Sequence, residues 1–139
     1  MGKEQIAELI GAALQARKKA YAPYSRFQVG AAILCADGSI CTGCNVENAS
    51  YPASNCAERT AVFKAVSEGK RDFLAVAVMG GPQDEEPQAD CTPCGICRQV
   101  LAEFAADGLV VITGTSTEDY RQYTLGELLP HSFGGENLQ

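Results

Sequence analysis

The hydrophobic residues change period along the first part of the chain. Within the first twenty residues they recur every three or four positions, which predicts an amphipathic helix. Two short strand-like runs follow at 28–35 and 39–44, and the Asp37-Gly38 pair between them is typical of a tight hairpin turn. Residues 45–55 are rich in Asn and Ser and are expected to form a loop.

The helical period returns at Cys56 and ends at Gly69, a residue typical of helix C-termini. Residues 73–79 are almost continuously apolar, as expected for a strand that is covered on both faces. The acidic segment 80–91 contains Gly and Pro and is expected to be a loop. A second helix is predicted after Pro93.

We expect this second helix to bury Ile96 and to stop near Gly108. Two further strands are predicted at 109–113 and 120–124, and the residues 124–127 resemble a capping box that starts a short helix. The whole pattern belongs to the α/β class. It predicts a three-layer α/β/α sandwich with a mixed sheet of about five strands.

Length, composition and charge indicate how many domains the chain has and which class of partner it binds. With 139 residues, 46% of them hydrophobic, the chain is expected to be one domain over 1–139. A net charge of -6 argues against nucleic acid as a partner, because such binding depends on clustered Lys and Arg, and favours a small molecule. The apolar runs are too short for a membrane span or a secretory signal, so we expect a cytoplasmic protein without a membrane partner.

The seven cysteines suggest metal or thiol chemistry. Cys94 and Cys97 are three positions apart at the start of the predicted helix after Pro93, so both thiols lie on one face. Cys56 opens the other predicted helix, and a helix N-terminus stabilises the thiolate that binds metal. Three sulfur ligands select zinc and leave a fourth position for water, which is typical of a catalytic site.

Two charged residues that follow Cys56 are expected to act beside the zinc site. Glu58 is close enough to reach the water without being a ligand, and could act as general base and then general acid. Arg59 could donate a hydrogen bond to a ligand sulfur and offset the negative charge of three thiolates.

The cysteine pattern is also compatible with sites that are not catalytic zinc centres. A Cys-x-x-Cys pair is often a redox pair or a structural zinc site. Cys91 extends the pair to a run of three, which could hold an iron–sulfur cluster, or could close a four-cysteine zinc site together with Cys56. Either site would make the protein a non-catalytic metal module.

The chain as a whole resembles the small homotetrameric cytidine deaminases, whose zinc signature combines His or Cys, Glu and Pro-Cys-x-x-Cys. The resemblance covers nearly the whole chain in the expected order. It rests on Tyr21-Ala22-Pro23-Tyr24-Ser25, Phe27-Gln28-Val29-Gly30-Ala31-Ala32, Gly43-Cys44-Asn45-Val46-Glu47-Asn48-Ala49, Cys56-Ala57-Glu58-Arg59-Thr60-Ala61, Pro93-Cys94-Gly95-Ile96-Cys97 and Leu128-Leu129-Pro130.

The resemblance implies roles for residues outside the metal site. Asn45 and Glu47 would bind the ribose 3′-hydroxyl, Phe27 would pack near the sugar and base, and the Ala57 backbone would hold the pyrimidine. Phe133 would stack on the base in an adjacent subunit. From the residues alone, the favoured interpretation is that Asn45 and Glu47 shape the turn after the second strand and that Phe27 and Phe133 pack in the core or against the tail.

The same resemblance implies a zinc-dependent hydrolase with one Zn²⁺ per subunit, acting in pyrimidine salvage. Its reaction would convert cytidine and 2′-deoxycytidine to uridine and 2′-deoxyuridine with release of ammonia. The alternatives are a related enzyme that deaminates a cytosine-containing antibiotic and the non-catalytic zinc-binding module.

Overall fold

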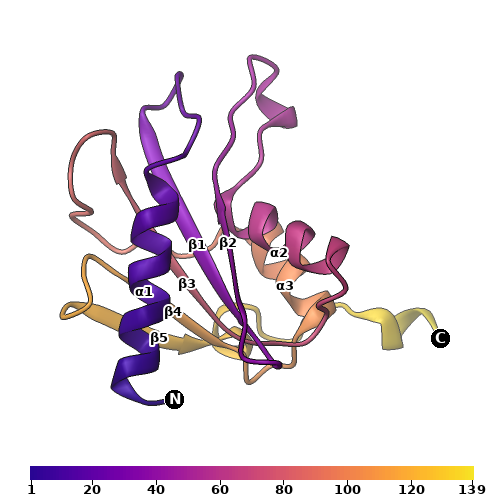
Figure 1. Cartoon of the computed structure of the whole chain (residues 1–139). Helices are drawn as coiled ribbons and strands as arrows, with labels where there is room; N and C mark the ends of the chain where they lie inside the picture. The colour runs from indigo at the N-terminus through magenta and orange to yellow at the C-terminus, as the bar shows by residue number, and fades with distance from the viewer.

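A five-stranded mixed sheet runs through the computed structural model, which describes residues 1–139 (Figure 1). The strand order is β2-β1-β3-β4-β5; only β3 and β4 pair in parallel, and the other neighbours are antiparallel. In chain order the elements are α1 (Lys3–Arg17), β1 (Phe27–Cys35), β2 (Ile40–Cys44), η1 (Tyr51–Ala53), α2 (Ala57–Ser67), β3 (Phe73–Pro82), α3 (Gly95–Phe104), β4 (Val110–Gly114), β5 (Tyr120–Thr124), α4 (Leu125–Leu128) and η2 (Gly135–Leu138).

Helices cover both faces of this sheet, and the predicted three-layer sandwich is confirmed. Helix α1 lies on one face, and α2 and α3 lie on the other (Figure 1). Each face has its own hydrophobic cluster, and alternate residues of β1 contribute to them: Ala32 and Leu34 to the α1 side, Ala31 and Ile33 to the α2 side. This burial on two sides explains why the central strands are continuously apolar.

Local signals were reliable where turn or cap chemistry decides the structure. The hairpin between β1 and β2 turns at Gly38, whose φ of 89° lies in the left-handed region that favours glycine. At α4, the Thr124 hydroxyl accepts from the Glu127 backbone while the Glu127 carboxylate accepts from the Thr124 backbone, so the predicted capping box is confirmed.

Three expectations were wrong. Strand β3 continues through Pro82, into the expected loop, because it pairs with β1 as far as Phe27. Helix α3 already ends at Phe104. Ile96 is 61% exposed, because it lies in the first turn of α3, beside a cavity and away from the core.

No helix combines the length and the apolar character that a bilayer crossing requires.

Close approach between α1 and β1 depends on Gly30. A Cβ atom at this position would lie 2.0 Å from the Ala13 carbonyl oxygen and 2.5 Å from the backbone nitrogen of Arg17. We therefore expect Gly30→Ala to reduce the free energy of unfolding by about 1–3 kcal/mol or more, the usual cost of overpacking. Thermal unfolding measures this change.

Gly11→Ala is the matched control, because Gly11 lies within α1 and a Cβ there meets nothing within 4 Å. It is expected to raise the free energy of unfolding by about 0.5–1 kcal/mol through helix propensity. Equal effects of the two substitutions would contradict the close approach.

Candidate metal centre and adjoining cavity

Two helices on the same face of the sheet begin at cysteines. Cys56 is the N-cap residue of α2 and Cys94 that of α3, and both have the extended backbone of a cap position. Neither side chain makes a capping hydrogen bond. Their sulfurs therefore remain available to a ligand next to unpaired backbone N–H groups.

The sulfurs of Cys56, Cys94 and Cys97 all lie within 4.8 Å of one another. The Cys56 and Cys94 sulfurs are 3.9 Å apart, and those of Cys94 and Cys97 are 3.5 Å apart. Cys97 is fully buried, whereas Cys94 is exposed. Three convergent soft donors at two helix starts fit zinc, and such a set is one ligand short of a closed tetrahedral site.

Arg59 lies against this cluster. Its Nη2 donates to the Cys56 sulfur at 3.3 Å, while its Nε is buried without a partner. A cation beside the sulfurs reduces the negative charge that three thiolates would otherwise concentrate. The expectation that Arg59 contacts a sulfur is met by this geometry.

Hydrogen bonds inside the cluster affect the ionisation of Cys56 and Cys97 in opposite directions. Hydrogen bonds from Cys97 and Arg59 outweigh the effect of burial and lower the pKa of Cys56 to about 5. The pKa of Cys97 is raised, first because its thiol donates to Cys56 and also through burial. These hydrogen bonds therefore favour the thiolate form of Cys56, which is the form that binds metal.

Glu58 is a buried acid next to the cluster. It belongs to the first turn of α2, is only 4% exposed and lines a cavity of about 440 Å³. Burial raises the pKa of Glu58 to about 7, and the charge of Cys56 acts in the same direction. A carboxyl group with a pKa near neutrality can both accept and donate a proton, as general acid–base chemistry requires.

Cys91 lines the same cavity but is not one of the three converging sulfurs. Burial, followed by the charge of Glu58, raises its pKa to about 11, so it remains a thiol. The closed four-cysteine arrangement with Cys56 is therefore absent from this structure.

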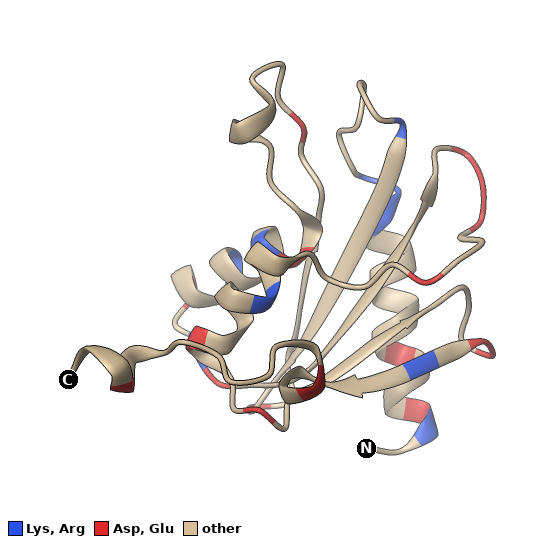
Figure 2. Ribbon diagram, turned by 180° about the vertical axis from the view of Figure 1, so that it is seen from behind, with Lys and Arg blue, Asp and Glu red and all other residues tan.

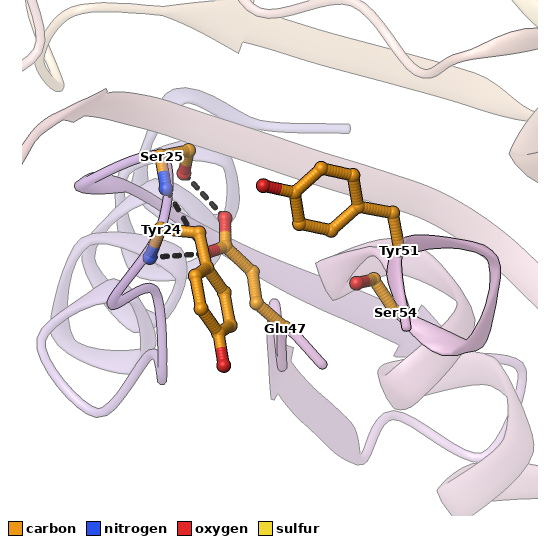
Figure 3. Close-up of a pocket in the computed structure, with 5 residues that line it drawn as sticks. All are labelled: Tyr24, Ser25, Glu47, Tyr51 and Ser54. Atoms are coloured by element: carbon orange, nitrogen blue, oxygen red, sulfur yellow. Dashed lines mark hydrogen bonds between the residues drawn. The ribbon is translucent and has the colours of Figure 1, made fainter. Parts of the chain in front are cut away.

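The cavity opens toward a second pocket, of about 350 Å³, with which it shares Glu47, Tyr51 and Ser54. Figure 3 shows how the Glu47 carboxylate faces the turn before β1. It accepts hydrogen bonds from the backbone of Tyr24 at 2.9 Å and of Ser25 at 3.1 Å, and from the Ser25 hydroxyl. The hydrogen bond from the Ser25 hydroxyl is the main reason that the pKa of Glu47 is lowered, so the carboxylate stays charged.

Asn45 is also bound to the backbone. Its Oδ1 accepts from the Val29 nitrogen at 2.8 Å, and its Nδ2 donates to the Phe27 carbonyl at 2.9 Å. Asn45 and Glu47 thus fix the backbone at the start of β1, and both also line the cavity. Each still has unused hydrogen-bonding capacity: one N–H and one lone pair on the amide, and one lone-pair site on the carboxylate.

A family model for the cytidine and deoxycytidylate deaminase zinc-binding region matches residues 3–113. The match includes the three converging cysteines and Glu58. The chain belongs to this deaminase family. Its members are zinc-dependent, which agrees with the donor set found here.

Individual deaminases are similar over almost the whole chain. The cytidine deaminase of Halalkalibacterium halodurans is 52% identical over 130 residues, covering 94% of this chain and 95% of the relative. A crystal structure of cytidine deaminase from Burkholderia pseudomallei has a TM-score of 0.82 and 49% identity, covering 91% of this chain and 97% of that one. The blasticidin-S deaminase of Bacillus cereus is 32% identical over 91 residues, covering 63% of this chain and 65% of the relative.

The structure brings most of the expected deaminase site together. The cavity is lined by Cys56, Ala57, Glu58, Arg59, Cys94, Asn45 and Glu47. Phe27 does not line it: this residue is 39% exposed, and its ring lies beside Gly80, which also neighbours the cavity residues Val29 and Cys91. Phe133 does not reach the cavity: it is 58% exposed on the C-terminal segment, which runs away from the sheet (Figure 1).

Sequence reasoning missed several residues of the wall. Val29, Cys91, Thr92 and Ile96 line the cavity, and Tyr51 lines both pockets. The signal for Tyr51 was an aromatic residue in a loop of small polar residues, where it has no core to join. Val29 and Ile96 were hidden because apolar residues in predicted strands and helices are assigned to the core by default. Cys91 was considered only as a possible metal ligand, and no sequence signal marked Thr92.

Proposed function

We propose that the chain hydrolyses the 4-amino group of cytidine and 2′-deoxycytidine to give uridine, 2′-deoxyuridine and ammonia. The observation that carries the proposal is a buried carboxyl group, Glu58, in a cavity lined by Cys56 and Cys94, whose sulfurs converge with that of the buried Cys97. The identity of about half to cytidine deaminases supports the same reaction.

Cys56, Cys94 and Cys97 would hold one zinc ion as thiolates, with Arg59 and the two helix N-termini offsetting their charge. Zinc in such a site acts as a Lewis acid that makes water a nucleophile near neutral pH.

Glu58 moves the protons of the reaction. In this proposal its carboxylate takes a proton from the attacking water and delivers it to N3 of the cytosine, which activates C4 toward addition. The same group then takes the proton of the hydroxyl added at C4 and passes it to the 4-amino nitrogen, so that the C4–N bond breaks, ammonia leaves and the uracil carbonyl forms. Its pKa of about 7 suits this double use.

The remaining wall would hold the nucleoside. The unused donor of Asn45 and acceptor site of Glu47 would bind the ribose 3′-hydroxyl, which needs one of each. The Ala57 backbone at the start of α2 would contact the pyrimidine, and Phe27 would pack at the sugar and base.

A substrate comparison tests this assignment against the antibiotic deaminase. Zinc-replete protein is expected to deaminate cytidine and 2′-deoxycytidine with kcat/KM at least about 100-fold above that for blasticidin S, because the sugar-binding pair has no partner in an antibiotic that lacks a ribose 3′-hydroxyl. Turnover of blasticidin S alone would support the alternative.

We further propose a homotetramer in which Phe133 completes the cavity of a neighbouring subunit. An exposed aromatic ring on a segment that extends from the fold supports this arrangement. The Phe133 carbonyl accepts from Gln99 of α3 at 2.9 Å, so the start of this segment is fixed to its own subunit.

A mixing experiment tests sharing of sites. Phe133→Ala and Glu58→Gln are each expected to lose most activity, whereas subunits exchanged between them should recover part of it. Recovery arises because a Phe133→Ala subunit keeps its Glu58 and receives Phe133 from its neighbour. Light scattering during size-exclusion chromatography measures the assembly, and full activity of Phe133→Ala alone would refute the sharing.

The proposal extends to the cellular role. The whole chain, 1–139, would act as one catalytic domain in the cytoplasm and would serve pyrimidine salvage by returning cytosine nucleosides to the uracil pool. Scattered Lys and Arg on an acidic chain favour a small-molecule partner over nucleic acid (Figure 2).

A further inference from the structure

Arg17, the last residue of α1, is a buried cation with no carboxylate partner. Its side chain is 6% exposed, and the ion pair in the structure joins other residues, Arg121 and Asp90. Such a charge is tolerated only when its N–H groups are directed to acceptors. The guanidinium directs four of its five N–H groups to main-chain oxygens.

Four N–H groups of Arg17 are used on three separate stretches of backbone. Nε donates to the Gln28 carbonyl at 3.1 Å, in β1. Nη2 donates to the carbonyls of Gly81 at 2.9 Å and Pro82 at 3.1 Å, at the end of β3. Nη1 donates to the carbonyl of Glu85 at 2.9 Å, in the loop that joins β3 to α3. This acidic loop is visible in Figure 2.

These contacts come from the face of the sheet opposite the metal centre. Gly30 points toward the end of α1, whereas Val29 points into the cavity. Gln28 is paired with Gly81, and Val29 with Gly80. Arg17 therefore contacts the β1–β3 strand pair on the α1 face of the sheet. The same part of the strand pair lines the cavity on the opposite face.

Gly80 links the strand pair to the cavity wall. A Cβ atom there would lie 3.0 Å from the Cys91 sulfur and 3.0 Å from Val29 and Phe27 side-chain carbons. At Gly81 a Cβ atom would lie 2.9 Å from Pro87 in the loop. The end of β3 is thus packed tightly against both the β3–α3 loop and the cavity wall. A displacement of this loop is therefore expected to displace Cys91 and Thr92, which belong to it.

We propose that Arg17 is a positioning residue for the deamination site: from the α1 face of the sheet, its guanidinium fixes the β3–α3 loop and so sets the separation between the cavity wall at Val29 and the wall at Cys91 and Thr92. It contacts neither substrate nor metal ligand. A guanidinium group can reach the three backbone stretches because its donors are spread over three nitrogens in one plane. A lysine cannot replace it, because all its donors are on a single nitrogen. This inference rests on the proposed deaminase function.

Arg17→Ala and Arg17→Lys test the proposal in zinc-replete protein, assayed well below the unfolding temperature. Both variants are expected to lower kcat/KM for cytidine by about tenfold to a hundredfold, the range that a displaced wall produces. Methylguanidinium should restore activity to Arg17→Ala, because it fills the vacated space with the same donors. If Arg17→Ala does not fold, Arg17→Lys decides by the same measure of kcat/KM.

Ile10→Ala is the matched control, since Ile10 is a fully buried residue of the same helix in the α1-side cluster. It lowers stability but should leave kcat/KM within twofold of the wild type and show no response to methylguanidinium. A zinc-loaded Arg17 variant with kcat/KM within twofold of the wild type would overturn the proposal. An equal loss in Ile10→Ala would also overturn it.

Amide hydrogen exchange separates this proposal from the function on which it rests. In Arg17→Ala the loop 83–91 should exchange faster while α2 keeps its protection; unchanged exchange of the loop would overturn the positioning role. This readout needs no turnover. Failure of the wild-type protein to deaminate cytidine would instead count against the proposed function alone.

Discussion

Replacing Glu58 with glutamine is expected to lower kcat for cytidine by about 10⁴-fold, the upper end of what general acid–base catalysis contributes. The effect is large because one carboxyl group handles both proton transfers, and the amide cannot take up or release a proton in this range. Glutamine has nearly the same shape as glutamate. The cavity and the zinc content should therefore be preserved.

Glu68→Gln is the matched control for this substitution. Glu68 is the exposed C-cap residue of the same helix, α2, and its carboxylate accepts only from Cys41, at 3.8 Å. We expect Glu68→Gln to keep wild-type kcat. Near-normal turnover by Glu58→Gln with zinc bound would show that Glu58 is not the proton carrier.

Replacing Cys97 with alanine is expected to remove both zinc and activity. Cys97 is the buried member of the three-sulfur cluster, so no outside group can replace it. Loss of a direct ligand should weaken zinc binding by more than about 100-fold, the upper limit for substitutions that only support a ligand. Metal analysis after gel filtration and titration with a chelator measure this change.

Cys91→Ala is the comparison that separates the two metal hypotheses. Because the Cys91 sulfur lies outside the cluster, this variant should retain one zinc ion per chain. Loss of zinc from Cys91→Ala, equal to the loss from Cys97→Ala, would instead support a closed four-cysteine site and a non-catalytic module.

The sequence predicted those parts of the structure that local chemistry determines. The starts of α2 and α3 at Cys56 and Cys94 could be placed because helical periodicity begins directly after each cysteine and Pro93 marks the second start. The turn at Gly38 and the cap at Thr124 depend only on neighbours in the chain. The pairing of Cys94 with Cys97 is local in the same way, whereas the approach of Cys56 to them is a contact between two separate helix starts.

Other features depend on contacts between distant segments, and the sequence alone did not reveal them. The last residues of β3 are two glycines and a proline, whose strand propensity is low; pairing with β1 keeps them extended. Arg17 reads as a solvated residue at a helix end, yet its acceptors are 11 to 68 residues away in the chain. Phe133 lies outside its own cavity, so its proposed role involves a second chain.

The most direct test of the account is the fate of water oxygen during turnover. Zinc-replete protein is incubated with cytidine in H₂¹⁸O, and the products are analysed by mass spectrometry together with an ammonia assay. Hydrolysis at C4 with Glu58 as proton carrier predicts uridine with one ¹⁸O atom at C4 and one ammonia per uridine, and neither product above background with Glu58→Gln. Absence of uridine from fully zinc-loaded wild-type protein, or equal product from Glu58→Gln, would contradict it.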